Sequence, residues 1–172
     1  MSQLILKKAN TDDLIALQKI SIETFSSTYS NLNTKANMQL YVSESLSEMQ
    51  LMAELVSSKT SFYLAYRENY LIGYFKLNFP EKDLQPFGNI SMEVDRIYLE
   101  EKYQGKGYGK KLFESIIEIA RSEKMNRIWL GVWSKNTNAL EFYRKLGFVK
   151  FDKHLFTLGE DEQLDYLLEL NI

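Results

Sequence analysis

Three glycines and three lysines gather in the segment QGKGYGKK, residues 104–111. Glycine lets backbone amides approach a ligand closely and adopt positive φ angles. A helix that starts within the same segment would add unpaired N–H groups and the positive end of its dipole. Together with Lys106, Lys110 and Lys111, this junction is typical of a pyrophosphate-binding cradle. The alternative is a glycine-rich turn that only makes room for packing between a strand and a helix.

The spacing of these glycines restricts the ligand. Lys110 stands where both G-x-x-x-x-G-K-[ST] and G-x-G-x-x-G require a glycine. Nothing nearby offers the hydroxyl group that would hold Mg²⁺ beside a nucleoside triphosphate. The segment therefore favours a ligand that carries a pyrophosphate but needs no metal, and coenzyme A fits better than NAD or ATP.

Composition argues against several other classes of function. The chain has 172 residues, and we expect residues 1–172 to form a single domain with a sizeable core. The net charge of −2 argues against a general nucleic-acid binder. With no cysteine and one histidine, we expect no disulfide, no metal site and no Ser-His-Asp triad. Since no signal-peptide or membrane-spanning pattern occurs, we expect a cytoplasmic protein that binds no membrane.

Periodicity and turn residues predict a mixed α/β fold in the order βα(α)βββαβαββ. Thr11 is the expected N-cap of the first helix, and residues 34–58 form one or two further helices. Glu68 and Asn69 form the turn of a hairpin, and both prolines fall in a loop at residues 80–89. The expected strands cover residues 4–8, 61–67, 70–79, 90–99, 127–133, 149–158 and 163–170, and the expected helices lie near 13–25, 34–58, 108–124 and 136–146.

The strand at residues 90–99 has an irregular alternation. Met92 and Val94 are apolar at even positions, whereas Ile97 and Leu99 are apolar at odd positions. Because side chains alternate between the two faces of a sheet, the buried phase slips by one residue between Val94 and Ile97. A β-bulge would return both pairs to the core and would leave backbone groups unpaired for a ligand. A strand that is buried on both faces is the alternative.

Two motifs that follow each other along the chain resemble those of a known protein family. Gln104-x-x-Gly107-x-Gly109 follows this strand, and Asn136 stands seven residues before Tyr143 in NTNALEFYRKLGF. The combination resembles the acetyl-CoA signature of the GNAT (GCN5-related N-acetyltransferase) superfamily. The segments SIETF, DRIY, IWLGVW and GEDEQLD further resemble PaiA-type spermidine/spermine N-acetyltransferases. The resemblance implies an α/β (α+β) GNAT fold, a mixed central sheet of about seven strands flanked by helices, with a β-bulge in the fourth strand.

The implied activity is transfer of an acetyl group from acetyl-CoA to a primary amine by direct attack in a ternary complex. The implied acceptor is a polyamine such as spermidine or spermine. A protein or peptide N-acetyltransferase and a non-catalytic coenzyme A-binding sensor or regulator are the alternatives. By analogy with this fold, a homodimer is possible. The resemblance implies donor contacts from Ile97, Tyr98, Leu99, Gln104, Gly105, Lys106, Gly107, Tyr108, Gly109, Lys110, Asn136, Asn138 and Tyr143.

Tyr143 is the implied general acid. A phenol with a pKa of about 10 can donate a proton to the leaving thiolate, whose conjugate acid has a pKa of about 8.5. A core aromatic on an amphipathic helix is the alternative for Tyr143, and a simple N-cap is the alternative for Asn136. Glu93 and Asp95 are candidates for the general base or for neutralising a polycation. Solvated strand carboxylates are the alternative for both.

The resemblance also implies an acceptor groove beside the late part of the first helix. Glu23, Phe25 and Tyr29 would wall this groove, and Glu93 would contribute to substrate binding. The acidic run GEDEQLD, residues 159–165, adds negative potential for a cation, although an exposed hairpin turn is the commoner role of such a run. His154 is expected to be a packed or exposed strand residue rather than a catalyst.

Overall fold

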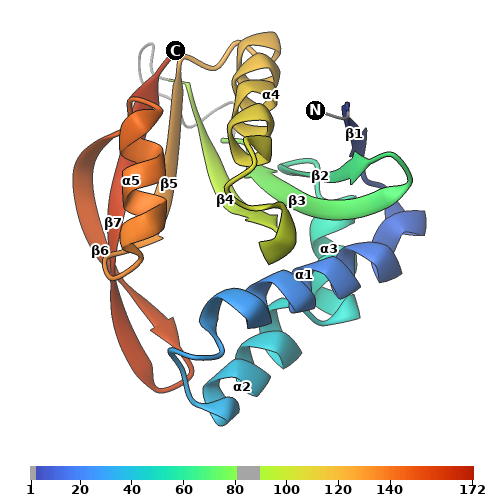
Figure 1. Cartoon of the computed structure of the whole chain (residues 1–172), viewed down its shortest axis with the longest axis vertical. Coiled ribbons are helices and arrows are strands. Elements are labelled where there is room, and N and C mark those ends of the chain that lie inside the picture. Colours follow the sequence, from blue (N-terminus) through green and yellow to red (C-terminus); the bar gives the residue numbers. More distant parts are fainter. Residues whose placement is uncertain (1–2, 81–89) are drawn as a thin grey trace.

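The computed structural model describes residues 3–80 and 90–172, which form a seven-stranded sheet with helices on both faces (Figure 1). The strands lie in the order β1-β2-β3-β4-β5-β7-β6. The order along the chain is the predicted one, which confirms the mixed α/β fold. The expected loop at residues 80–89 lies, apart from Pro80, outside the described residues. The strands are β1 (Leu4–Lys8), β2 (Thr60–Arg67), β3 (Tyr70–Asn78), β4 (Ser91–Leu99), β5 (Arg127–Trp133), β6 (Val149–Leu158) and β7 (Asp161–Asn171), and the helices are α1 (Leu14–Tyr29), α2 (Lys35–Ser45), α3 (Glu48–Val56), α4 (Tyr108–Ser122) and α5 (Thr137–Lys145).

Side-chain caps start α2, α3 and the short turn that precedes α1. The side chain of Asn10 accepts a hydrogen bond from the backbone N–H two residues later, and a 3₁₀ turn at Thr11–Asp13 then leads into α1. The expected cap at Thr11 is therefore wrong by one residue, because asparagine caps a helix at least as well as threonine does. Thr34 and Ser47 cap α2 and α3, so the region 34–58 forms two helices.

The predicted β-bulge lies in β4 at Asp95. Lys76 of β3 pairs with Arg96, and the next residue of β3 pairs with Val94. Asp95 is therefore the extra residue between these two pairs. It returns the apolar side chains before and after it to the same core, as the slip in the alternation requires. The bulge in the fourth strand is confirmed.

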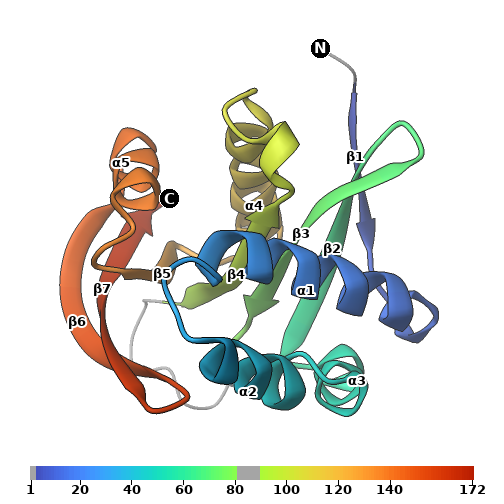
Figure 2. The ribbon, with the colours of Figure 1, turned by 60° about the horizontal axis from the view of Figure 1, so that its bottom comes forward.

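Separate groups of helices cover the two faces of the sheet (Figure 2). α4 and α5 pack on one face, and Leu112, Phe113 and Ile116 of α4 are fully buried in the main core there. α1 and α3 pack on the other face, against β2 and β3, through a second core that includes Leu17 and Leu51. Within residues 3–80 and 90–172, no helix combines the length and the apolar character needed to cross a membrane.

Candidate active site

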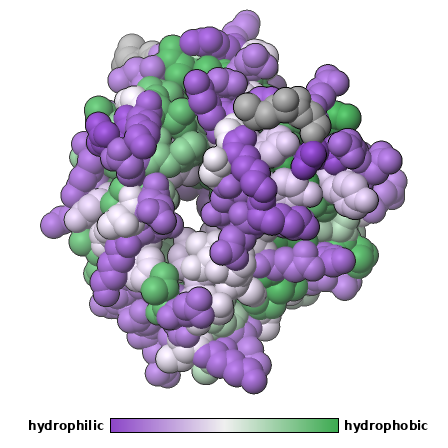
Figure 3. Space-filling view, viewed as in Figure 1, coloured by the Kyte–Doolittle hydropathy of each residue, from purple (hydrophilic) through white to green (hydrophobic). Residues whose placement is uncertain are grey.

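β4 and β5 form a wedge because they pair over only part of their length. The two parallel strands are in register at residues 91–93 and 127–129, and beyond these residues the two strands, both fully described, form no further pairs. From residue 94 to residue 99, the edge of β4 that faces β5 therefore has backbone groups without a strand partner. Figure 3 shows an opening through the molecule in the region where β4 and β5 diverge in Figure 1.

The bulge contributes to this wedge indirectly. We expected the bulge itself to leave backbone groups unpaired for a ligand, but it disrupts the pairing with β3, on the opposite edge of β4. A bulge also bends the strand that carries it. Asp95 lies two residues beyond the last pair with β5. The bulge thus lies where β4 and β5 part, and the β5-facing edge of β4 beyond it has no strand partner among the residues that the structure describes.

The loop after β4 presents backbone amides next to the wedge. Gly105 and Gly107 have positive φ angles of 69° and 81°, which glycine adopts without strain. Gly107 is the N-cap of α4, and no side chain caps this helix start. The N–H groups of the first turn therefore lack an intrahelical acceptor and lie at the positive end of the helix dipole. With Lys106 and Lys110 exposed beside it, the loop has the geometry that a pyrophosphate group requires.

Three other loop residues support the shape of this junction. The side chain of Gln104 donates a hydrogen bond to the backbone carbonyl of Leu99 at 3.0 Å and ties the loop to the end of β4. Tyr108 is buried in the main core, so only its backbone can reach a ligand. A Cβ added at Gly109 would already contact the Phe142 ring at 3.5 Å, so α5 packs directly on the first turn of α4.

Asn136 begins α5. Its side-chain oxygen accepts a hydrogen bond from the backbone N–H of Ala139 at 3.2 Å, so it is the N-cap of the helix. This bond leaves the Nδ2 group of Asn136 available to a ligand, and the cap role is therefore compatible with a binding role. Asn138 lies exposed in the first turn of the same helix. Gly147, with a φ angle of 93°, follows the end of α5 as the sequence predicts.

Tyr143 is buried, with 7% of its surface exposed. Its ring contacts Phe113, Phe142 and Phe148 with centroid separations of 5.9, 5.2 and 5.5 Å. Burial raises the pKa of the Tyr143 hydroxyl group, and the nearby Tyr29 raises this pKa further. Tyr29 belongs to α1, on the opposite face of the sheet from α5. The pKa of the Tyr143 hydroxyl group thus responds to a residue from the other face of the sheet.

The two candidate carboxylates on β4 have different partners. Nδ2 of Asn78 donates a hydrogen bond to Oε2 of Glu93 at 2.8 Å, whereas Nζ of Lys76 lies 2.7 Å from Oδ2 of Asp95. Burial is the main cause that raises the pKa of Glu93, and the hydrogen bond from Asn78 partly opposes it. Within the described residues, Glu93 is the one of the two carboxylates that has no ion pair.

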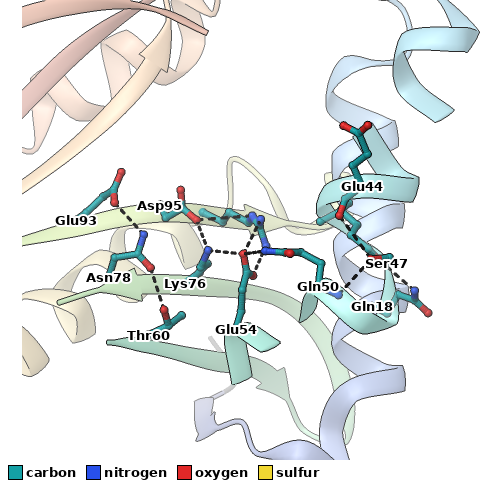
Figure 4. A network of polar contacts seen from close by, with 12 residues as sticks. Gln18, Glu44, Ser47, Gln50, Glu54, Thr60, Lys76, Asn78, Glu93 and Asp95 are labelled. Carbon is teal, nitrogen blue, oxygen red and sulfur yellow. Dashed lines mark hydrogen bonds and ion pairs between the residues drawn. The ribbon is translucent and has the colours of Figure 1, made fainter. Parts of the chain in front are cut away.

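Lys76 belongs to a cluster of four charges, three of them buried, that joins α3 to β3 and β4 (Figure 4). Its Nζ atom lies 2.8 Å from Oε1 of Glu54 on α3, and Arg96 of β4 donates to Oε2 of Glu54 at 3.1 Å. The side chains of these three residues are at most 12% exposed. With Asp95, the cluster holds two cations and two anions, so each buried charge has a partner.

The three α1 residues predicted to wall the acceptor groove lie in different environments. The side chain of Glu23 is 52% exposed. Phe25 is 5% exposed and lies in a small core between α1, α2 and the end of β6, rather than on a groove surface. The hydroxyl groups of Tyr29 and Tyr98 are hydrogen-bonded to each other, and the ring centroid of Tyr29 lies 6.4 Å from that of Trp133. Of the three, Tyr29 is the residue that the structure brings to the wedge, because it contacts both β4 and β5.

The sequence did not reveal that the central strand β5 is buried on one face only. On its other face, Gly131 is exposed and Trp129 and Trp133 are half-buried. Oδ2 of Asp165 on β7 lies 3.5 Å from the position that a Cβ on Gly131 would take, and Cε1 of His154 lies 3.8 Å from it. This open face therefore presents a carboxylate beside the part of β5 that no longer pairs with β4.

Two signals in the sequence could have indicated this open face of β5. A glycine within a strand often marks a close approach of another group, and Gly131 interrupts an otherwise apolar run. Asp165 is the second signal, a carboxylate within the apolar part of β7. We expected the run GEDEQLD to be an exposed turn, but only Gly159 and Glu160 form the turn, because β7 begins at Asp161. Asp165 is half-buried in the strand, and burial raises its pKa.

Comparison with known proteins agrees with this architecture. A family model described as the acetyltransferase (GNAT) family matches residues 22–148. The chain is 32% identical over 169 residues to an uncharacterized N-acetyltransferase in the pepI 3′ region of Lactobacillus delbrueckii subsp. lactis, and the match covers 98% of each chain. It is 36% identical over 97 residues to the spermine/spermidine N(1)-acetyltransferase of Bacillus subtilis (strain 168), which is 55% of this chain and 62% of that protein.

Among solved structures, the fold is similar to that of the PaiA N-acetyltransferase of Thermoplasma acidophilum in complex with coenzyme A. The TM-score is 0.81 at 24% sequence identity, over 99% of both chains. The fold is thus that of a GNAT-type N-acetyltransferase. The chain belongs to the acetyltransferase (GNAT) family, and its structure is PaiA-like.

Proposed function

We propose that this protein transfers the acetyl group of acetyl-CoA to a primary amine of a polyamine, such as spermidine or spermine, in a ternary complex. The observation that carries the proposal is the amide-rich loop beside the free edge of β4, together with the acidic and aromatic face of β5 and β7. The loop suits a pyrophosphate, and the face of β5 and β7 suits a cationic amine. The spermine/spermidine acetyltransferase among the relatives supports the acceptor, and the coenzyme A complex of the PaiA protein supports the donor.

The residues that would hold acetyl-CoA come from three elements. The backbone amides from Gly105 to Lys110 would bind the pyrophosphate, and the free edge of β4 from Ile97 to Leu99 would pair with the pantetheine arm. The Nδ2 group of Asn136 would donate to the same arm, beside Asn138. When bound, acetyl-CoA supplies an activated thioester. An unpaired amide on the β4 edge would stabilise the negative charge that develops on the thioester oxygen.

Two residues would move protons in this proposal. The acceptor amine is protonated at neutral pH, and Glu93 would take its proton through a water molecule. Its raised pKa, which results mainly from burial, brings this carboxylate closer to the pKa of a working base. Tyr143 would give its proton to the sulfur of the leaving group. Because burial raises the pKa of Tyr143, the hydroxyl group keeps its proton until the thiolate forms.

The carboxylates and aromatic rings on this side of the sheet favour a polyamine as the acceptor. Glu93 and Asp165 supply two carboxylates, and neither has an ion pair among the described residues. Tyr29 and Trp133 supply aromatic faces, which attract alkylammonium groups. A chain of methylene groups with several ammonium groups therefore matches this surface better than a peptide N-terminus, which carries a single charge.

The test is thiol release from acetyl-CoA with a panel of polyamines, diamines, monoamines, peptides and aminoglycosides. We expect polyamines to give the highest kcat/KM. In Asp165→Asn, KM for spermidine should rise roughly tenfold, since a charge-assisted contact is lost, while KM for a monoamine changes little. Glu162→Gln, at an exposed carboxylate of the same strand, is the matched control. If peptides were the best acceptors, the polyamine assignment would fail, and if no amine accelerated release, the protein would be a coenzyme A-binding sensor.

A further inference from the structure

We infer that Asn78 on β3 is the positioning residue that makes Glu93, rather than Asp95, the proton acceptor in this reaction. The inference rests on the proposed function. The two side chains face each other across a register pair of β3 and β4, and Nδ2 of Asn78 donates to Oε2 of Glu93 at 2.8 Å (Figure 4). This bond fixes one carboxylate oxygen of Glu93, and the other oxygen remains available to a water molecule or an amine.

Asn78 also has a partner on β2, which agrees with the orientation that the Glu93 carboxylate requires of its amide. Oγ1 of Thr60 donates a hydrogen bond to Oδ1 of Asn78 at 3.4 Å, and these two residues are a register pair of β2 and β3. With its oxygen accepting from Thr60, the amide must turn its NH₂ group toward Glu93. A chain of side chains across three neighbouring strands therefore orients the carboxylate.

Asp95, the second carboxylate of β4, has a different kind of partner on β3. Lys76, two residues before Asn78, has a buried ammonium group 2.7 Å from Asp95 and 2.8 Å from Glu54. Asp95 thus compensates the buried charge of Lys76. A cation holds the carboxylate of Asp95, whereas a neutral donor holds that of Glu93 and leaves it without an ionic partner in the part of the chain that the structure describes.

The bulge makes this division of roles possible. Because Asp95 is the extra residue of β4, it has no register partner on β3 and can turn toward Lys76, which pairs with Arg96. Glu93 precedes the bulge and keeps its regular pair with Asn78. Without the extra residue, β4 would stay in regular register with β3 beyond Glu93.

The charged groups around Glu93 predict how its titration responds to a change at Asn78. Asp95 on the same strand raises the pKa of Glu93, and Lys76 on β3 and His154 on β6 lower it. The hydrogen bond from Asn78 also lowers this pKa, since it stabilises the ionised carboxylate. Removal of the donor should therefore raise the pKa of Glu93. Because Glu93 must be ionised to accept a proton, the activity of the variant should then begin to fall at a higher pH than that of the wild-type protein.

The experiment compares Asn78→Asp with the wild-type protein. This variant keeps the shape of the side chain but loses the donor and adds a negative charge beside Glu93. The acid limb of the kcat/KM profile should move to higher pH, with a roughly tenfold or larger loss of rate on that limb, while KM for acetyl-CoA stays unchanged. Asn78→Gln should restore part of the shift. Asn31→Asp, the same substitution at an exposed position, is the control and should leave the profile unchanged.

A second readout does not require turnover. The Glu93 carboxyl group, assigned by its loss in Glu93→Gln, can be titrated by carbon-13 NMR in both proteins, and its midpoint should lie at higher pH in Asn78→Asp. If acetyl transfer occurs but neither the titration nor the limb moves in Asn78→Asp, the inference is overturned and the proposed function stands. If Asp95→Asn, and not Glu93→Gln, removes the acid limb, the inference is also overturned. If no amine is acetylated, the proposed function fails, and with it the role assigned to Asn78, while the titration still shows whether Asn78 sets the charge of Glu93.

Discussion

The hydroxyl group of Tyr143 has two roles to choose between, the general acid and a part of the core. Three phenylalanine rings surround the tyrosine ring, as expected for a core aromatic. Tyr29, on the opposite face of the sheet, nevertheless raises the pKa of the Tyr143 hydroxyl group, in addition to the effect of burial. The burial of the ring agrees with both roles. Removal of the hydroxyl group alone therefore distinguishes them.

Tyr143→Phe separates the two roles by kinetics. If Tyr143 donates the proton to the leaving thiolate, kcat should fall roughly 10²-fold or more. The affinity for coenzyme A and the melting temperature should change little, because the ring and its contacts remain. Steady-state kinetics and calorimetry measure the two effects. Tyr70→Phe, at an exposed tyrosine of the β2–β3 hairpin, is the control. An unchanged kcat would show that Tyr143 serves only the core.

Individual residues of the site differ in how far the sequence could predict them. The roles proposed for Gly107, Asn136 and Tyr143 came from the family resemblance of two short motifs, and the structure places Gly107 and Asn136 at the starts of α4 and α5. Asp165 could not be predicted in the same way. The carboxylate of Asp165 lies beside Gly131 only because of the register in which β7 pairs with β5. A local sequence pattern does not encode the register between distant strands.

At the scale of elements, the junction between β4 and α4 depends on two glycines with left-handed backbone. A side chain at such a position costs about 1–2 kcal/mol, because Cβ approaches the following carbonyl oxygen. Gly107 is the N-cap of α4, so any relaxation of this strain would move the amides of the first turn. The conformation of the loop and the direction of its N–H groups are thus coupled.

Gly107→Ala should therefore weaken binding of coenzyme A roughly tenfold and lower the free energy of unfolding by about 1 kcal/mol. Gly147→Ala is a matched control, because Gly147 also has a positive φ angle but lies beyond the end of α5. It should lose similar stability and keep its affinity for coenzyme A. Calorimetric titration and urea unfolding measure the two quantities. Equal losses of affinity in both variants would contradict a specific role for the loop.

At the scale of the whole molecule, the buried charge cluster connects the helices on one face of the sheet with the strand that carries the site. Glu54 of α3 contacts Lys76 and Arg96, which come from neighbouring strands. Truncation of Glu54 would leave one anion, Asp95, for two buried cations. An incomplete buried ion pair is strongly destabilising, because the remaining charge has lost its solvation and its partner.

Glu54→Ala should lower the free energy of unfolding by about 3 kcal/mol or more. Glu48→Ala, at an exposed position in the first turn of α3, should cost less than about 1 kcal/mol. Urea unfolding, followed by circular dichroism, gives both values. Similar small losses in the two variants would show that the cluster contributes no more than a surface ion pair does.

By itself, the sequence determined the order of helices and strands, the position of the bulge and the amide-rich loop. These features depend on alternation, helical periodicity and glycine content, which act over a few neighbouring residues. Only the tertiary structure decided that β4 and β5 diverge, that β5 is open on one face, and which partner each β4 carboxylate takes. Glu54 and Arg96, for example, are 42 residues apart in the chain. Such contacts arise when separate elements pack together, so no local pattern along the chain specifies them.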